Sequence, residues 1–158
     1  MLNIVLFGPP GAGKGTQAEN IKENYNLVHL STGDIFRKNI GESTDLGILA
    51  KSYIDKGELV PDEVTIKMLE SEGNSYKDVN GFIFDGFPRT TEQANALDVF
   101  LKSIGTEVTK MVALNVPEKE LVSRLLNRGK ESGRTDDQDE NIISNRIKVY
   151  EKNTAVLA

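Results

Sequence analysis

The sequence predicts an α/β fold in which helices cover both faces of a central parallel sheet. Short apolar runs alternate along the chain with longer stretches of helical pattern, which is the order that a parallel sheet with crossover helices requires. The apolar runs are continuous rather than alternating, as expected of strands buried on both faces. A glycine-rich segment directly follows the first run and leads into a helical stretch. The 158 residues are enough for one domain with its own core.

Each expected element follows from the hydrophobic pattern and its flanking residues. Strands are expected at residues 2–7, 27–30, 81–85 and 110–114. Helices are expected at residues 14–24, 34–41, 46–56, 62–72, 90–104, 118–128 and 139–156. Two segments interrupt the alternation. Residues 31–59 are expected to form a small helical insertion over one edge of the sheet. Residues 129–138 are Gly-rich and charged, and are expected to lie outside the core as a mobile flap.

The composition excludes several classes of function. The chain has no cysteine, which excludes a disulfide framework, a thiol nucleophile and a zinc site with cysteine ligands. Its net charge of -5 and pI of about 5.0 argue against bulk attraction to nucleic acid or to an anionic membrane. No apolar run is long enough to span a bilayer. We therefore expect a cytoplasmic protein without a nucleic-acid or membrane partner.

Residues 8–16, with the sequence GPPGAGKGT, have the composition of a phosphate-binding loop. Glycines allow the main chain to approach oxyanions closely, and a lysine at the helix start can reach the outer phosphates. The pattern G-x-x-x-x-G-K-[ST] is missed at Gly15, although Thr16 supplies a hydroxyl one place later. A purely structural strand-to-helix turn is the less favoured interpretation. The segment predicts binding of a nucleoside triphosphate.

Charged residues are expected at the same edge of the sheet. Asp85 ends the third apolar run, so it should emerge at the carboxyl edge, where it could hold magnesium through water, and Arg89 follows it in the next loop. Arginines are otherwise concentrated near the loops on this side: Arg37, Arg124, Arg128, Arg134 and Arg146. In an acidic protein, such a group predicts a local site for a polyanion.

Three other titratable residues are given lesser roles. His29 is the only histidine and ends an apolar run, so a structural role is expected for it. Asp136 and Asp137 could form a catalytic carboxylate pair, but ion pairs that fasten the flap are the favoured interpretation.

Taken together, these segments resemble those of the adenylate kinases, the ATP:AMP phosphotransferases among the P-loop nucleoside monophosphate kinases. Residues 8–17 resemble the family's phosphate loop, in which a glycine before the threonine is normal. Residues 29–34 and 57–62 resemble the start and end of its mobile monophosphate-binding insertion, and residues 81–90 resemble its magnesium and AMP-phosphate segment. The resemblance implies a three-layer α/β/α P-loop fold with three parts. The core would comprise residues 1–30, 60–127 and 139–158, the AMP-binding insertion residues 31–59, and a short lid residues 128–138.

The resemblance also implies a set of site residues. Those for ATP are Gly11, Ala12, Gly13, Lys14, Gly15, Thr16, Arg124 and Arg128. Those for AMP are Thr32, Arg37, Glu58, Leu59, Val60, Gly86, Phe87, Pro88, Arg89, Gln93, Arg134 and Arg146, with Gln93 reading adenine. The residues that would support catalysis are Lys14, Arg89, Arg124, Arg128, Arg134 and Arg146. Asp85 would associate with Mg²⁺ through water, and no zinc is expected.

The expected reaction is reversible phosphoryl transfer from magnesium-ATP to AMP, giving two ADP, by a monomer. Thr32 and residues 90–93, with the sequence TTEQ, resemble the adenylate type, so AMP is favoured over UMP or CMP. A kinase for UMP or CMP is the alternative within this class. Members of the family usually continue past the last helix into a final strand and helix, and by that resemblance the chain is truncated. The second alternative is therefore a nucleotide-binding fragment without activity.

Overall fold

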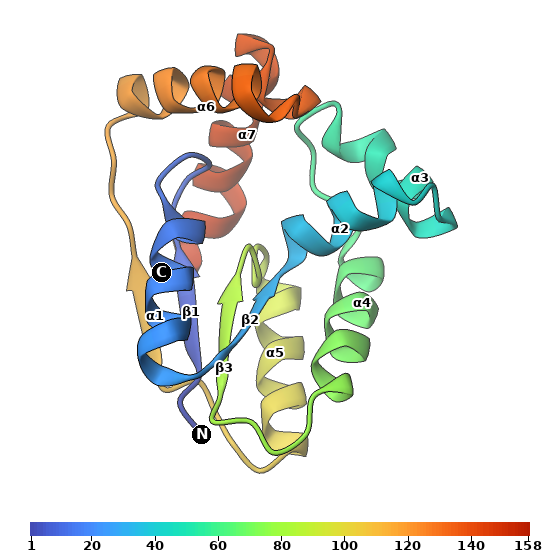
Figure 1. Ribbon diagram of the computed structural model, residues 1–158, viewed down its shortest axis with the longest axis vertical. Helices are drawn as coiled ribbons and strands as arrows, with labels where there is room; N and C mark the ends of the chain where they lie inside the picture. The colour runs from blue at the N-terminus through green and yellow to red at the C-terminus, as the bar shows by residue number, and fades with distance from the viewer.

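The fold is built on a four-stranded parallel sheet, seen in a computed structural model that describes residues 1–158 (Figure 1). The strands are β1 (Ile4–Phe7), β2 (Val28–Ser31), β3 (Phe82–Asp85) and β4 (Lys110–Ala113). Their order across the sheet is β2-β3-β1-β4. The register pairs Asp85 with both Leu6 and Ser31, so the carboxyl ends of β1, β2 and β3 meet at one edge of the sheet. All four strands were predicted from the sequence.

The helices are α1 (Lys14–Tyr25), α2 (Thr32–Gly41), α3 (Asp45–Ile54), α4 (Asp62–Ser75), α5 (Thr91–Ser103), α6 (Glu118–Ser132) and α7 (Glu140–Val149). A short 3₁₀ turn, η1 (Thr135–Asp137), separates α6 from α7. After α7 the chain continues as a π-helical turn, η2 (Tyr150–Thr154), and a last 3₁₀ turn, η3 (Ala155–Leu157). No helix combines the length and the apolar composition that a bilayer-spanning segment needs.

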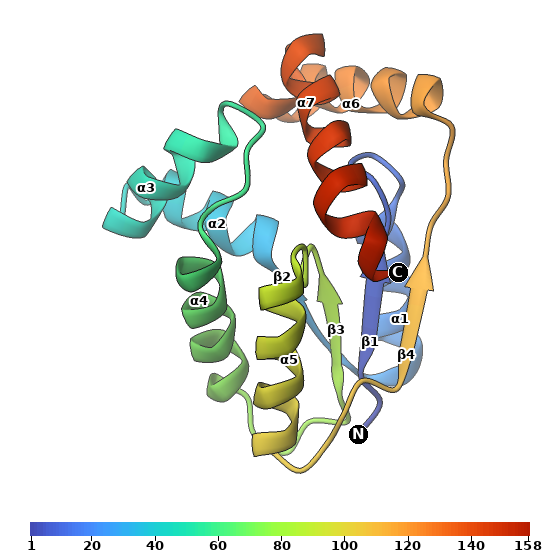
Figure 2. The ribbon, with the colours of Figure 1, turned by 180° about the vertical axis from the view of Figure 1, so that it is seen from behind.

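Side chains of the sheet alternate between two separate hydrophobic cores, which gives the three layers. Toward α1 they pack with Ala18 and Leu27, and the strands contribute Ile4, Leu6 and Ile83. Toward α4 and α5, which lie in front of the sheet in Figure 2, the strands contribute Val5, Phe7, Leu30, Phe82 and Phe84. Two further clusters hold the other parts of the molecule together. One joins α6 and α7, and the other joins α2, α3 and α4. The predicted α/β/α class is confirmed.

The edge strand β4 differs from the expectation of strands buried on both faces. All four of its residues are exposed, and Met111 retains 58% of its accessible surface. β4 pairs only with β1 at one edge of the sheet, and none of its residues belongs to the hydrophobic clusters that cover the other strands. The apolar run therefore predicted the strand correctly but not its burial.

The expectation that residues 129–138 lie entirely outside the core is wrong. Helix α6 continues through Ser132, four residues past its expected end, and Gly129 is buried. Asp136 and Asp137 are also buried, with Asp137 fully inaccessible. The reason is that arginines from α6 and α7 surround both carboxylates, so charged residues are buried here without an apolar pattern. Mobility of this segment stays a prediction.

Candidate active site

A cleft of about 540 Å³ opens at the carboxyl edge of the sheet. The ends of β1, β2 and β3 form its floor, the segment 31–60 lines one side, and α6 and α7 line the other. Parallel sheets bind ligands at this edge because the loops that follow neighbouring strands converge there. The predicted site residues are therefore brought together by the topology of the sheet.

The loop between β1 and α1 is shaped to receive an anion. Gly13, the residue before α1, has a φ of 95°, and no side chain caps the helix. A Cβ at Gly13 would meet no atom within 4 Å, so open space lies over the loop. The first-turn N–H groups of α1 have no side-chain acceptor, and the helix dipole favours negative charge beside them.

Lys14 folds back over this loop. Its Nζ donates to the carbonyl oxygens of Gly8 at 2.9 Å and Pro9 at 3.2 Å. Burial lowers the pKa of Lys14 to about 8, because the attraction of Asp85 only partly offsets burial and the repulsion of nearby arginines such as Arg89. The site therefore holds a cation whose charge is poorly compensated by the protein, and added phosphate charge would compensate it.

Asp85 lies beside Lys14 at the end of β3. Burial would raise the pKa of Asp85, but the hydrogen bond from His29 and the charge of Lys14 outweigh it and lower the pKa. The two ring nitrogens of His29 lie 3.2 Å from carboxylate oxygens of Asp85 and Glu19. His29 therefore has the structural role expected for it, and it holds Asp85 in place.

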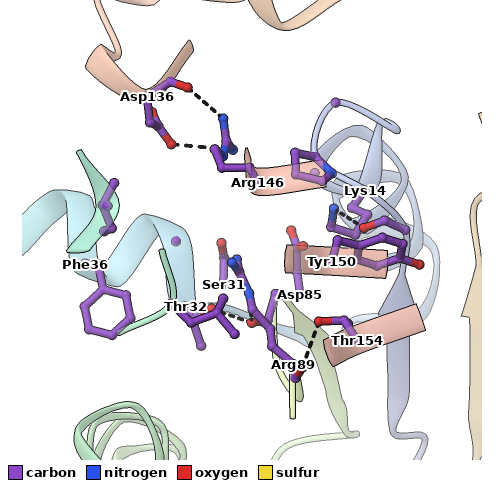
Figure 3. Close-up of a pocket in the computed structure, with 18 of the residues that line it drawn as sticks. Lys14, Ser31, Thr32, Phe36, Asp85, Arg89, Asp136, Arg146, Tyr150 and Thr154 are labelled. Atoms are coloured by element: carbon purple, nitrogen blue, oxygen red, sulfur yellow. Dashed lines mark hydrogen bonds and ion pairs between the residues drawn. The ribbon is translucent and has the colours of Figure 1, made fainter. Parts of the chain in front are cut away.

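Arg89 extends from the loop after β3 into the centre of the cleft (Figure 3). Its Nε donates to the carbonyl of Gly86 at 2.7 Å. Gly86 has a φ of 76°, and a Cβ there would come within 2.8 Å of both Arg89 Nη2 and Thr32 Oγ1, so only glycine fits. Burial, together with the charge of Arg146, lowers the pKa of Arg89 to about 10. Arg89 remains a cation at neutral pH.

Two aspartates bind three arginines at the far side of the cleft. Asp137 accepts two hydrogen bonds from Arg128, at 2.6 and 3.1 Å, and one from Arg146 at 2.7 Å. Arg134 lies 3.4 Å from both Asp136 and Asp137. This geometry supports ion pairs that fasten the segment between α6 and α7, rather than a catalytic carboxylate pair. Arg124 pairs only with Glu120, on the exposed surface of α6.

Gln93 is buried in a network behind Arg89. Its Oε1 accepts from the main-chain N–H of Arg89, and its Nε2 donates to Asp62 Oδ1, both at 2.8 Å. The hydroxyl of Thr90 donates to the same oxygen of Asp62 at 2.9 Å and also caps α5 by accepting from Gln93 N–H. These bonds fix the orientation of the Gln93 amide.

The insertion contacts η1 and α7 across the mouth of the cleft. Thr135 Oγ1 donates to Asp55 Oδ1 at 3.0 Å, and Asn145 Nδ2 donates to the carbonyl of Lys56 at 2.9 Å. On the inner side, Thr32 Oγ1 donates to the carbonyl of Gly86 at 2.8 Å. The described conformation is therefore one in which the two sides of the cleft touch.

Nearly all residues predicted for the site line this cleft. They are Gly11, Gly13, Lys14, Gly15, Thr16, Thr32, Arg37, Glu58, Leu59, Val60, Asp85, Gly86, Pro88, Arg89, Gln93, Arg124, Arg128, Arg134 and Arg146. The side chains of Ala12 and Phe87 instead pack into the hydrophobic clusters. Sequence reasoning missed Tyr150 and Thr154, which also line the cleft. Their spacing of four and eight residues from Arg146 was the available signal.

Comparison with known proteins agrees with this geometry. The family model described as Adenylate kinase matches residues 6–158. A protein of Flavobacterium psychrophilum named adenylate kinase is 64% identical over 157 residues, which cover 99% of this chain and 83% of the relative. The chain belongs to the adenylate kinase family.

More distant members of the family match over the same region. An adenylate kinase of Bacteroides fragilis is 54% identical, with 99% of this chain and 82% of the relative covered. One of Mycobacteroides abscessus is 49% identical, with 99% and 83% covered. The family resemblance read from the residues is confirmed.

The donor set of this adenylate kinase site fits magnesium only with the help of a nucleotide. No group of three or more His, Asp or Glu side chains lies together as a metal cage. Asp85, next to the phosphate loop, is a single ionised carboxylate. Mg²⁺ binds through one or two carboxylates, several waters and substrate phosphates, and this site supplies the carboxylate.

Proposed function

We propose that this chain catalyses reversible phosphoryl transfer from ATP to AMP, giving two molecules of ADP. The observation that carries the proposal is the arrangement of cations in one cleft. Lys14 on the phosphate loop lies on one side, Arg89 lies at the end of β3, and arginines of α6 and α7 lie opposite. The triphosphate of ATP and the single phosphate of AMP, brought end to end, would need such a cluster because both are anionic. Membership of the adenylate kinase family supports the same reaction.

We assign the two nucleotides to the two halves of the cleft. ATP would place its phosphates on residues 8–16, with Arg124 and Arg128 beside them. AMP would bind between the insertion, residues 31–59, and the Arg89 loop, with Gln93 facing the base. Every lining residue comes from one chain, so a monomer would suffice.

In the proposed reaction an oxygen of the AMP phosphate attacks the γ-phosphorus of ATP in line. The new bond joins that oxygen to phosphorus, and the bond to the bridging oxygen of ATP breaks, so that one ADP leaves and the other is formed. Lys14 and the arginines would neutralise the charge on the transferring group. No covalent enzyme intermediate is required, because positioning and charge neutralisation lower the barrier.

We propose that Asp85 associates with Mg²⁺ through water. Bound magnesium would supply further neutralisation of the phosphate oxygens. The contact of His29 with Asp85 would keep the carboxylate directed toward the cleft. Residues 128–138 would act as a lid that helps to exclude water, because α6, η1 and α7 form one side of the cleft.

The two alternatives are less well supported. The relatives are named adenylate kinase, which does not favour a kinase for UMP or CMP. A fragment without activity is not favoured either, because the predicted lysine and arginines all line one cleft.

The proposal is tested by measuring ADP formation by the purified chain with magnesium-ATP and, in turn, AMP, UMP, CMP and GMP. We expect turnover with AMP and little with the others. Lys14→Met should lower kcat on the order of 10²- to 10³-fold, as expected when one preorganised charge-stabilising group is removed.

The control is Lys22→Met, which removes an exposed lysine of the same helix outside the cleft. It should leave turnover unchanged. Equal turnover with pyrimidine acceptors, or full activity in Lys14→Met, would contradict the proposed function.

A further inference from the structure

The chain enters the cleft once more after its last α-helix. Helix α7 passes into the π-helical turn η2, a geometry that is rare and frequent at functional sites. Arg146, Tyr150 and Thr154 follow one another at intervals of four residues, and all three line the cleft. The end of α7 and the turn after it therefore present a continuous face to the site.

Thr154 makes a specific contact from this turn. Its hydroxyl donates to the main-chain carbonyl of Arg89 at 2.8 Å, across 65 positions of sequence (Figure 3). Only 5% of Thr154 is exposed, so water does not readily replace the hydroxyl. The bond is thus a tertiary contact between the end of the chain and the loop after β3.

This contact completes the fixing of Arg89. The residue lies in the loop between β3 and α5, where its main chain has no ladder or helix partner. Its N–H instead donates to Gln93, its carbonyl accepts from Thr154, and its Nε donates to Gly86. Three polar contacts thus determine the backbone position and the direction of the guanidinium. Only the contact of Thr154 comes from outside the segment 86–93.

We infer that Thr154 is a positioning residue for Arg89, and that it sets the affinity of the cleft for the acceptor monophosphate. The inference rests on the proposed function, in which Arg89 binds the phosphate of AMP. A guanidinium forms two directed hydrogen bonds with a phosphate, so a small shift of its backbone misaligns both. Loss of the Thr154 contact should therefore weaken the binding of AMP. The affinity for ATP, which binds on the phosphate loop, should be almost unchanged.

The test compares the dissociation constants of AMP and ATP, each measured by calorimetry, in matched variants of the full chain. Thr154→Val and Thr154→Ala both remove the hydroxyl but differ in size, whereas Thr154→Ser keeps it. We expect the first two to raise the dissociation constant of AMP about tenfold, the size of effect expected when one hydrogen bond between charged groups is misaligned. Thr154→Ser should bind AMP as the unmodified chain does. Lys152→Ala, at an exposed position of the same turn, is the control.

Other outcomes would overturn the inference. Unchanged AMP affinity in Thr154→Val would show that the hydroxyl does not position Arg89. Equal losses of affinity for AMP and for ATP would indicate a general packing role of Thr154. So would a loss of AMP affinity in Thr154→Ser as large as that in Thr154→Ala. Melting curves of all variants separate these effects from loss of the fold.

A variant of the arginine separates this inference from the proposed function. If Arg89→Ala leaves AMP affinity unchanged, the proposed role of Arg89 is wrong, and the inference fails with it. If Arg89→Ala weakens the binding of AMP but Thr154→Val does not, only the inference about Thr154 fails. When both variants weaken the binding of AMP, the double variant should bind AMP no more weakly than Arg89→Ala does. The reason is that the hydroxyl of Thr154 acts through the guanidinium of Arg89.

Discussion

At the scale of single residues, Lys14 has an unusual protonation equilibrium. Its pKa is lowered to about 8, first by burial and then by neighbouring arginines. Because burial and the neighbouring arginines disfavour the charged ammonium, anionic phosphates should raise this pKa when they bind. We therefore predict that ATP binding at pH 8 takes up about half a proton at Lys14, whereas at pH 6 this residue contributes none. The measurement is the binding enthalpy at each pH in buffers with different ionisation enthalpies.

The matched variant for this prediction is Lys14→Arg, which keeps a positive charge that does not titrate near pH 8. Its proton uptake at pH 8 should fall by the amount assigned to Lys14. Identical uptake in the variant would mean that another group titrates. The same equilibrium implies that ATP affinity declines as the pH rises above 8.

A second prediction concerns selectivity for the base. The main-chain N–H of Arg89 and Oδ1 of Asp62 together fix which side of the Gln93 amide can face a base, and Asp62 supplies the acceptor for the amide N–H. Adenine offers a donor and an acceptor in the opposite order to guanine, so a reversed amide would favour guanine. We expect Asp62→Ala to lower the preference for AMP over GMP about tenfold, equivalent to about 1.4 kcal/mol. Asp62→Asn keeps the accepting oxygen and should restore the preference, as judged by kcat/KM for both nucleotides.

At the scale of elements, the segment between α6 and α7 is held by charge rather than by apolar packing. Burial would raise the pKa of Asp137, but hydrogen bonds from Arg128 and Arg146 and the charge of Arg134 lower it. A lowered pKa in the folded state means that the ionised carboxylate stabilises the fold above its unfolded pKa. This stabilisation is lost as the pH falls through the folded value.

We predict that Asp137→Asn lowers the free energy of unfolding by about 2 kcal/mol at pH 7. This is less than the roughly 3–5 kcal/mol for breaking a fully buried pair, because the Arg128 side chain is 39% exposed. Urea titrations should show that the difference in free energy of unfolding between this variant and the unmodified chain becomes smaller when the pH falls below the ordinary pKa range of an aspartate. Asp139→Asn is the control, since asparagine caps a helix about as well as aspartate. A constant difference at all pH values would contradict the assignment.

At the scale of the whole molecule, the sequence predicted the sheet well because each strand is a local apolar run. The phosphate loop and Asp85 were also predictable, since both follow directly from the ends of strands. The burial of Asp137 was not, because its three arginine partners lie in α6, in α7 and at Arg134 between α6 and η1, and they carry no apolar pattern. The contact between Thr154 and Arg89 was hidden for a similar reason, since it joins distant segments through one hydroxyl.

The exposure of β4 shows a second limit of sequence reasoning. A continuous apolar run indicates a strand in a parallel sheet, but the position of that strand in the sheet depends on strand order. Strand order and the packing of helices are properties of the whole molecule, and here they leave Met111 and Val112 exposed at one edge while Leu30 of the other edge strand is buried. Local pattern therefore determined the elements, while tertiary pairing determined their burial.

The cleft is also where separately packed parts of the molecule meet. The insertion has its own small core around Phe36, α6 and α7 have another around Leu125, and the sheet has its own two. A ligand that contacts all of these parts should stabilise them jointly. At a hundred times its dissociation constant, each nucleotide adds about 2.7 kcal/mol if it binds only the folded state. For a chain of this size that corresponds to a rise in Tm of about 5–10 °C.

We therefore predict that AMP and a non-hydrolysable ATP analogue, added together, raise the Tm more than either does alone. Both can then occupy the cleft at once, as in-line transfer requires. Arg89→Ala should remove most of the stabilisation contributed by AMP and keep most of that contributed by the ATP analogue, because the proposed function assigns Arg89 to the phosphate of AMP and residues 8–16 to the phosphates of ATP. If the two nucleotides together raise the Tm no more than the better one alone, they compete for one place. The division of the cleft into two nucleotide sites would then be wrong, even if each nucleotide binds.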